Sequence, residues 1–378
     1  MTIQRPEQEE SYRQSEIGFI PRDWKVVKLK EVAEKLKAGG TPLKAIKEYW
    51  NGDIPFVKIE DITSAQKYLT KTVSTISEKG LNNSSAWMVP PYSILLSMYA
   101  SIGEVAINKI AVSTNQAILA IIPKKENDVE YLYYCLKYHA KRLYSLIVQT
   151  TQKNVNKGIT ENLLIPLPLP QEQKRIALVL SQIQKAIEQQ DKIIQATSNL
   201  KKSLMQRLFT KGIGHTEFKD SEVGEIPKSW QTIKFHRIMS EKTLNGIYKK
   251  KEHYGKGYKI VRMTEFFKGD ILEIDEMKRI NLSKEELLKY SLREGDLLFA
   301  RRSFKVEGSG KCVLVPSINE PVVFESSIIR VRLDRKRALP NFYTYYLNSG
   351  AGRKLITRII RTLAVSGVTS GDIRELIV

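Results

Sequence analysis

The chain has 378 residues, of which 42% are hydrophobic and 27% charged, and its formal net charge is +20. This balance is that of a globular protein, and the length suggests two or three domains. No apolar run approaches the roughly 20 residues of a membrane-spanning helix, and two cysteines, Cys135 and Cys312, cannot form a disulfide framework. The polar start MTIQRPEQEESYRQ does not resemble a secretory signal, so we expect a cytoplasmic protein.

The first part of the chain is repeated in the second. Residues 15–24 read SEIGFIPRDW and residues 221–230 read SEVGEIPKSW, with six identical positions at an offset of 206. Matching segments follow in the same order: 56–58 with 260–262, 93–96 with 295–298, 116–122 with 326–333, and 130–134 with 341–345. This spacing indicates a duplicated domain, because solenoid repeats recur every 20–50 residues or so. Strand-like apolar runs alternate with short helical patterns, which predicts α+β domains at 1–165 and 215–378.

The segment between the two copies, residues 166–214, predicts a long helix. Alternating prolines at 166, 168 and 170 give extended backbone and then permit a helix start, and no Pro or Gly interrupts residues 171–210. Gly212 and Gly214 supply the stop. The apolar seam consists of Ile176, Leu180, Ile183, Ile187, Ile194, Leu200, Leu204 and Leu208. The 3–4 spacing shifts phase before Leu200, and Gln190 and Thr197 lie in the seam, so the heptad is imperfect. The helix length and the seam favour a coiled coil that needs a partner helix; a helix packed on a domain face is the alternative.

Two segments resemble catalytic motifs but lack the residues that the chemistry needs. Gly308-Ser309-Gly310-Lys311 is followed by Cys312, where a phosphate-binding loop needs Ser or Thr for Mg²⁺, so we interpret it as a turn between strands. Pro90-Pro91-Tyr92 follows Val89, where an amino-methyltransferase needs a polar side chain. The four histidines have no metal-ligand spacing. We therefore predict a binding protein without a metal or a catalytic residue.

The positive charge favours nucleic acid as the partner, since Lys and Arg bind phosphates and Arg reads guanine through two donors. In the second copy, the best candidates for base contacts are Arg301, Arg302 and Ser303, after the strand at 297–300; Ser97 and Tyr99 occupy the equivalent place in the first. Candidates for phosphate contacts, or alternatively solvated loop residues, are Lys249, Lys250, Lys251, Lys256, Lys37, Lys44 and Lys47. Loops near the domain ends add Gln152, Lys153, Asn154 and Arg361.

The markers SEIGFIPRDW, SEVGEIPKSW, GDLLFARRS (295–303) and PLPLPQEQKRI (166–176) together resemble the specificity subunit of type I DNA restriction–modification systems. The resemblance covers residues 15–378. It implies two target-recognition domains, each reading one half of a split double-stranded DNA target. The helix would set the spacer and dock the methylation subunits. The resemblance also implies that the methyl donor and ATP sites belong to partners, which include a restriction subunit.

One feature departs from that family. Residues 371–378 align with 158–165, so the second Pro-Leu-Pro segment and its helix have no counterpart. Either the sequence stops short of that helix, or a second copy of the chain supplies it by dimerisation. Two other functions remain as alternatives: a self-contained DNA methyltransferase or nuclease, and a coiled-coil adaptor that binds DNA without regard to sequence.

Overall fold

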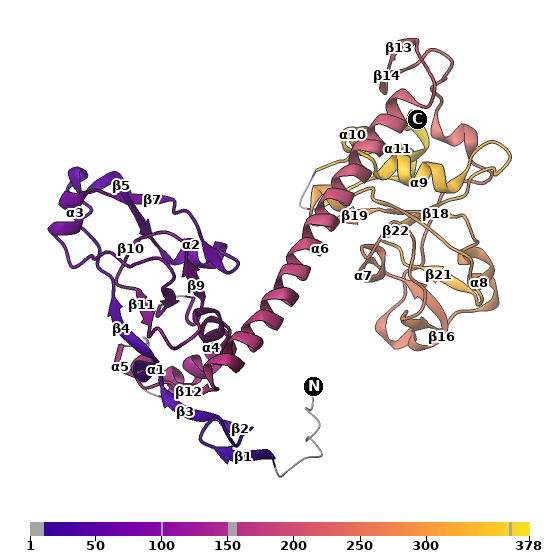
Figure 1. The fold of residues 1–378 in the computed structure, drawn as a ribbon. Coiled ribbons are helices and arrows are strands. Elements are labelled where there is room, and N and C mark those ends of the chain that lie inside the picture. Colours follow the sequence, from indigo (N-terminus) through magenta and orange to yellow (C-terminus); the bar gives the residue numbers. More distant parts are fainter. Residues whose placement is uncertain (1–10, 100, 150–156, 363–364) are drawn as a thin grey trace. The chain divides into compact units, whose positions relative to one another are not determined.

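The computed structural model describes residues 11–99, 101–149, 157–362 and 365–378; for 141–149 and 157 it describes the backbone alone. The chain divides into two compact units, Met1–Gln190 and Asp191–Val378. The boundary falls inside α6 (Pro170–Lys211), so one helix belongs to both units (Figure 1).

Unit 1 is built on a five-stranded sheet with the order β4-β11-β8-β9-β6. Its strands are β4 (Ala33–Ala38), β11 (Ile118–Pro123), β8 (Ile94–Ser97), β9 (Val105–Asn108) and β6 (Tyr68–Leu69). A second sheet comprises β10 (Ser113–Thr114), β5 (Trp50–Val57) and β7 (Ser74–Ile76). The remaining elements are the hairpin β1 (Tyr12–Ser15) and β2 (Gly18–Pro21), the pair β3 (Lys25–Lys28) and β12 (Leu164–Leu167), and the helices α1 (Leu29–Val32), α2 (Ile59–Ser64), α3 (Glu78–Asn82), α4 (Val129–Gln149) and α5 (Lys157–Glu161).

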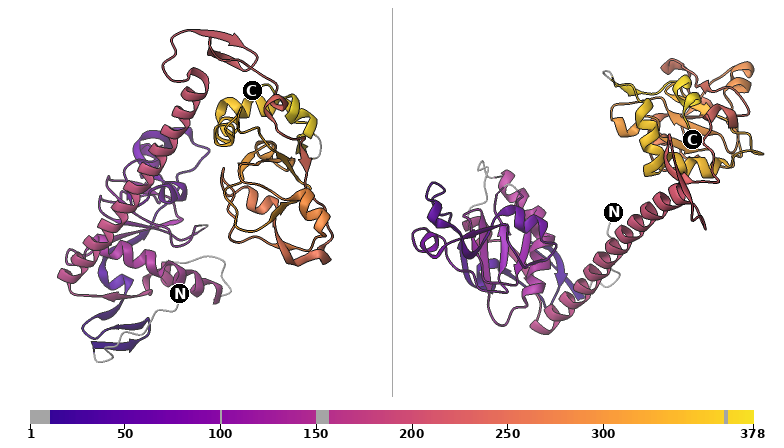
Figure 2. Two further views of the ribbon diagram at one scale, coloured as in Figure 1. Left: turned by 90° about the vertical axis from the view of Figure 1, so that its right-hand side faces the viewer. Right: turned by 90° about the horizontal axis from the view of Figure 1, so that it is seen from above.

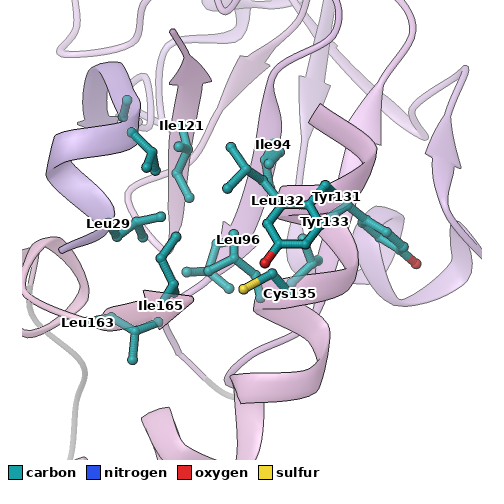
Figure 3. Packing of buried hydrophobic residues seen from close by; sticks show 14 of the residues in the cluster. Leu29, Ile94, Leu96, Ile121, Tyr131, Leu132, Tyr133, Cys135, Leu163 and Ile165 are labelled. Carbon is teal, nitrogen blue, oxygen red and sulfur yellow. The ribbon is translucent and has the colours of Figure 1, made fainter. Parts of the chain in front are cut away.

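Both faces of the large sheet in unit 1 are buried. Ile94 and Leu96 of β8 point to one face, where they pack with Leu132 and Leu136 of α4 (Figure 3). Leu95 points to the other face and packs with residues of β5, β6 and α2. The sequence of such a strand is a continuous apolar run, because the side chains on both faces of the sheet are buried. The sheet therefore separates two cores within the unit.

Unit 2 repeats this arrangement. Its four-stranded sheet has the order β15-β22-β18-β20, and its three-stranded sheet the order β17-β16-β21. The strands are β15 (Leu244–Asn245), β22 (Ile328–Val331), β18 (Leu297–Ala300), β20 (Cys312–Leu314), β17 (Arg279–Ile280), β16 (Tyr254–Val261) and β21 (Val322–Phe324). Two further pairs are β13 (Phe218–Ser221) with β14 (Gly224–Pro227), and β19 (Arg302–Ser303) with β23 (Ser366–Gly367). The helices are α7 (Met263–Phe266), α8 (Lys284–Tyr290), α9 (Pro340–Asn348), α10 (Gly350–Ile359) and α11 (Ser370–Glu375).

Strand pairing confirms the duplication. Phe56 pairs in parallel with Ser113 in unit 1, and Ile260 pairs in parallel with Val323 in unit 2. Leu95 pairs with Ala106, as Leu298 pairs with Val313. Leu95 and Leu298 are therefore equivalent, at an offset of 203. The predicted match of 93–96 with 295–298 has an offset of 202 and was wrong by one residue. The correction matters because a shift of one residue moves every side chain of a strand to the other face.

The repeated segment SE-x-G-x-IP forms the same hairpin in each unit for a stereochemical reason. Gly18 and Gly224 have φ angles of +108° and +106°, which residues with a side chain rarely adopt. The hydroxyls of Ser15 and Ser221 donate to the carbonyl oxygens of those glycines at 2.6 Å. The identical positions at 15–24 and 221–230 therefore include those that define the turn.

Helix α6 is drawn as one continuous helix in Figure 2. Its bounds confirm the predicted helix and extend it by one residue at each end. At its start, Gln173 is buried; its side chain accepts from Asp128 N at 3.0 Å and donates to Pro168 O at 2.9 Å. At its end, Gly212 and Gly214 have φ angles of +65° and +75°. These left-handed residues stop the helix as the sequence predicted.

Candidate nucleic-acid interface

The Arg301–Ser303 segment lies in the connection between β18 and β20 of unit 2. Arg301 is half-buried, and its guanidinium donates to Ser326 O at 3.4 Å. Arg302 is exposed and, with Ser303, forms the short strand β19. The hydroxyl of Ser303 accepts from Lys305 N at 3.1 Å. The three candidates therefore differ: Arg301 is oriented by a hydrogen bond, Arg302 faces solvent, and the Ser303 side chain bonds within its own loop.

Arg361 lies beside this segment, although 58 positions separate it from Ser303 in the sequence. Gly367 of β23 pairs with Arg302 on one side and forms a bridge with Arg361 on the other. The Arg361 guanidinium also donates to Asp372 at 2.7 Å. Burial alone would raise the pKa of Asp372, but hydrogen bonds from Thr369 and Arg361 hold it below its ordinary value. Two groups of candidates predicted separately thus belong to one surface.

A second loop joins this surface through Ser326. The backbone N–H of Ser326 donates to Ile247 O at 2.9 Å, while its carbonyl accepts from Arg301. The next residue after Ile247 is Tyr248, whose side chain is 79% exposed. The loop that carries Lys249–Lys251 therefore starts beside Arg301.

The lysines of that loop are not equivalent. Lys249 forms an ion pair with Glu286 at 2.6 Å and is 21% exposed, so it serves to hold α8 rather than to present a free charge. Lys250 and Lys251 are exposed. Lys256 is also exposed and stands between Gly255 and Gly257, where β16 bulges away from β17. Three of the four predicted phosphate candidates thus face solvent.

In unit 1 the predicted lysines are exposed, but one of them is engaged by an aromatic ring. Lys37 on β4 lies over the ring of Trp87 at 5.3 Å, and Lys35 lies over the same ring at 4.5 Å. Lys44 and Lys47 are exposed in and beside the short 3₁₀ helix Lys47–Tyr49. The Lys44–Lys47 segment is a counterpart of the lysine loop in unit 2, since β5 and β16 follow the two segments.

Ser97 does not reach the surface that a base contact requires. It is 1% exposed, and its hydroxyl donates to Tyr99 O at 2.9 Å. The reason is that β8 is buried on both faces, so its last residue is buried as well. Tyr99 is partly exposed. Gln152, Lys153 and Asn154 lie outside the residues that the structure describes.

Most of the predicted seam of α6 faces solvent within each unit. Ile176 packs against the core of unit 1. The other seven positions, Leu180, Ile183, Ile187, Ile194, Leu200, Leu204 and Leu208, are between 36% and 59% exposed. A row of exposed aliphatic side chains along one helix is typical of a surface that another helix covers.

Different chemistry attaches α6 to each unit. In unit 1 the buried Lys67 donates to Ser181 at 2.8 Å, to Glu130 at 3.0 Å and to Tyr134 at 3.2 Å. Burial alone would lower the pKa of Lys67, but the bonds to Tyr134 and Glu130 raise it above its ordinary value. In unit 2 the contact is aromatic: the ring of Phe209 lies 5.4 Å from Phe342 and 5.6 Å from Tyr346.

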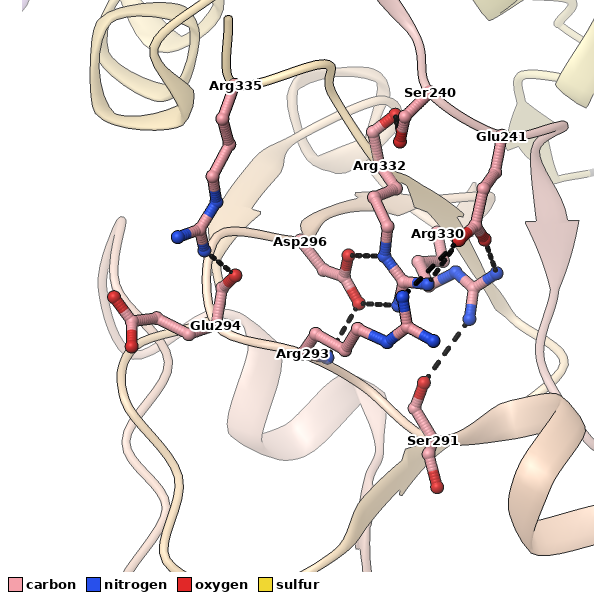
Figure 4. A network of polar contacts seen from close by, with 9 residues as sticks. All are labelled: Ser240, Glu241, Ser291, Arg293, Glu294, Asp296, Arg330, Arg332 and Arg335. Atoms are coloured by element: carbon pink, nitrogen blue, oxygen red, sulfur yellow. Dashed lines mark hydrogen bonds and ion pairs between the residues drawn. The ribbon is translucent and has the colours of Figure 1, made fainter.

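A network of ion pairs lies at the end of β22 in unit 2 (Figure 4). The carboxylate of Asp296, which is 1% exposed, accepts from Arg332 at 2.6 and 2.7 Å. Glu241 accepts from Arg330 at 3.1 Å and from Arg332 at 2.8 Å. Both arginines lie on β22 or directly after it, and β22 pairs with β18, the strand that leads to Arg301. The network therefore holds the strands that position the candidate base reader.

The described residues contain neither a cluster of metal ligands nor a membrane-spanning helix. Within them, no group of three His, Cys, Asp or Glu side chains is arranged to hold a metal ion. None of the helices in the described ranges is long and apolar enough to cross a bilayer. Cys135 and Cys312 are free and buried, and burial raises the pKa of Cys135 to about 12. Residues 308–311 lie between β19 and β20, as predicted for a turn.

Sequence reasoning missed two exposed aromatic residues on the unit 2 surface. Tyr248 precedes the lysine run, and Phe304, which is 94% exposed, follows Ser303. The available signal was aromatic side chains interleaved with Lys and Arg, a pattern typical of nucleic-acid surfaces.

Comparison with known proteins gives a consistent result. A family model described as the type I restriction modification DNA specificity domain matches residues 21–197. The type I restriction enzyme MjaIX specificity subunit of Methanocaldococcus jannaschii is 30% identical over 343 residues, which cover 85% of this chain and 76% of that protein. The MjaVIII specificity subunit of the same organism is 27% identical over 357 residues, covering 93% and 81% of the two chains. A chain from a solved structure of the type I R-M system covers 95% of this chain and 86% of its own length, with 15% identity and a TM-score of 0.57, and shares the fold.

Proposed function

The chain belongs to the family of type I restriction enzyme specificity subunits, and from this premise we propose that each unit reads one half of a bipartite double-stranded DNA target. The family that the sequence markers predicted is thereby confirmed, and a subunit of this family directs an enzyme rather than being one. The duplicated fold supports the proposal, because two copies of one domain carry cationic loops at equivalent places.

In unit 2, Arg301 is proposed to contact base edges, while Arg302, Arg361, Lys250, Lys251 and Lys256 contact phosphates. In unit 1, Tyr99, Lys37, Lys44 and Lys47 take the corresponding places. Phosphate contacts provide affinity without sequence information, whereas base-edge contacts provide the choice of sequence. The partly buried position of Arg301 supports its role, because a base reader needs a fixed orientation.

Helix α6 is proposed to set the distance between the half-sites and to dock the methylation subunits along its exposed seam. At about 1.5 Å per residue, its 42 residues extend roughly 63 Å. The restriction subunit joins in the full complex. A second copy of this chain, bound through the same helix, is the other partner proposed for the seam; sedimentation of the chain alone and with methylation subunits distinguishes the two.

The methyl donor and ATP are proposed to bind to those partner subunits and not to this chain. A purified chain incubated with labelled methyl donor and DNA is then expected to transfer no label, and a self-contained methyltransferase would transfer it. The proposed site of action is the cytoplasm, where the cell's DNA is accessible to the complex.

The observation that carries the proposal is the matched strand pairing of two units joined by one helix. The test is to sequence the methylated bases of cells with and without this gene. We expect one motif, with two specified halves and an unspecified spacer, to lose methylation when the gene is deleted. Restoration by the intact gene is the control. A modified motif without two halves would contradict the proposal, and DNA binding without sequence preference would favour an adaptor.

A further inference from the structure

The connection from β18 to β20 in unit 2 is longer than its counterpart in unit 1. In unit 1, Leu96 pairs with Val105, so residues 97–104 connect the strands. In unit 2, Phe299 pairs with Cys312, so residues 300–311 do so. The pairing at the base of both hairpins is the same, and the four additional residues therefore lie in the loop.

The loop presents one aromatic ring between cationic residues. Phe304 is 94% exposed, and Arg302 and Lys305 beside it are exposed as well. The connection contains Arg301, Arg302, Lys305 and Lys311 against a single acid, Glu307. Among the described residues of the unit 1 connection, no aromatic side chain is exposed to this degree, since Tyr99 is partly buried.

Phe304 lies in a loop that is held by hydrogen bonds on both sides. Arg353, a half-buried residue of α10, donates to Glu307 O and to Ser309 O, both at 3.0 Å. On the other side, β19 pairs with β23. Gly310 N also donates to Ala300 O at 2.8 Å. These contacts hold both ends of the loop, so the ring is presented to solvent without a compensating contact in the fold.

We propose that Phe304 stacks on the face of a base at an opened step of the half-site that unit 2 reads, while Arg302 and Lys305 bind the adjoining phosphates. The inference rests on the proposed function and names a specificity-determining residue for the same surface. Apolar side chains that enter a duplex partly unstack a base step and bend the DNA. A protein partner fits less well, because lysine is depleted at protein interfaces and Lys305 lies directly beside this ring.

The test uses the full chain assembled with its methylation subunits and a duplex carrying the motif found by methylation sequencing. Phe304→Ala is expected to lower affinity by about 5- to 150-fold, the range for loss of one aromatic–base stack. Phe304→Trp is expected to retain wild-type affinity. Phe19→Ala is the matched control, since Phe19 is also an exposed phenylalanine, 76% accessible on the β1–β2 hairpin; its affinity should equal that of the wild type.

A single-strand nick placed at successive steps of the half-site gives the second measurement. A nick keeps every base edge but makes the step easier to open. The wild type is expected to bind more tightly when the nick lies at the stacking step, and Phe304→Ala is expected to show no such preference. Equal affinities of wild type and Phe304→Ala, an unchanged nick profile, or lost assembly with methylation subunits would overturn the inference. If the wild-type complex does not prefer the motif to a scrambled duplex, the proposed function itself fails, and the inference fails with it.

Discussion

At the scale of single residues, the adjacent residues Arg301 and Arg302 differ in their burial and hydrogen bonding. Arg301 is half-buried and its guanidinium bonds to Ser326 O, whereas Arg302 is exposed on β19. The sequence identified both as candidates because they follow a buried strand. It could not separate them, because the position of Ser326 depends on strand pairing 25 positions away.

We predict that Arg301→Ala weakens binding by about 1–3 kcal/mol and relaxes specificity at one half-site. Arg302→Ala is expected to weaken binding to all duplexes equally and to reduce the salt slope by about one unit. Fluorescence anisotropy with altered half-sites at several salt concentrations measures both. Equal losses on every duplex for Arg301→Ala would make that arginine a phosphate contact.

The ion pair of Asp296 with Arg332 is expected to stabilise unit 2 because both side chains are largely withdrawn from solvent. We predict that Asp296→Asn lowers the free energy of unfolding by about 1.5–3 kcal/mol, since the carboxylate that accepts two hydrogen bonds from Arg332 is lost while the pair of Arg332 with Glu241 remains. Urea unfolding measures the change. Glu48→Gln is the control: its pair with Lys79 is 72% exposed on both sides, so water screens the pair and no measurable change is expected.

At the scale of elements, regular local patterns were predicted well and long-range pairing was not. Helix α6 was predicted almost to its ends because proline, glycine and apolar spacing are local signals. The apolar segment 93–96, which the sequence matched with 295–298, forms most of strand β8. The burial of Ser97 was not predicted, because a strand buried on both faces shows no alternation of apolar and polar residues. Lys249 pairs with Glu286, 37 positions away in the sequence. Strand β19 pairs with β23, more than 60 positions away. Neither pairing leaves a local signal in the sequence.

Deleting residues 187–193 of α6 is predicted to change the tolerated spacer between half-sites. The deletion removes about 10 Å of helix, comparable to the rise of about three base pairs, and keeps the heptad seam in place. Methylation sequencing reports the spacer directly. The double variant Gln189→Ala, Gln190→Ala keeps the length and should keep the spacer; an unchanged spacer after the deletion would show that α6 does not set it.

At the scale of the whole molecule, two units with separate cores are expected to unfold in separate transitions. Their acid sensitivity should differ. In unit 1, Glu130 is the described carboxylate whose pKa is lowered despite burial, through hydrogen bonds from Tyr68, Ser181 and Lys67. In unit 2 the pKa values of several carboxylates are lowered by hydrogen bonds and charges from Arg and Lys: Glu241, Glu265, Glu286, Glu320, Asp372 and Glu375.

A carboxylate with a lowered pKa stabilises the folded state above its ordinary value of about 4, and this contribution is lost as pH falls through the folded-state pKa. Glu325, which is half-buried, has a pKa raised by burial and acts in the opposite direction in unit 2, but it is a single group. We predict that lowering the pH from 7 to about 3 shifts the calorimetric transition of unit 2 further than that of unit 1. The Asp296→Asn variant assigns the transitions, because it destabilises unit 2 and so identifies the transition that belongs to it. Equal shifts of the two transitions with pH would contradict the prediction.

The contact of Ser181 with Lys67 and Glu130 has a consequence for how this family can vary. Ser181 and Phe209 attach α6 to different units, and each attachment depends on which way its side chain points around the helix axis. One inserted residue between them turns the second attachment by about 100° relative to the first, whereas seven residues turn it by only about 20°. Tolerated length variants of α6 should therefore come in steps near whole turns, so that the reach of the protein changes in discrete increments.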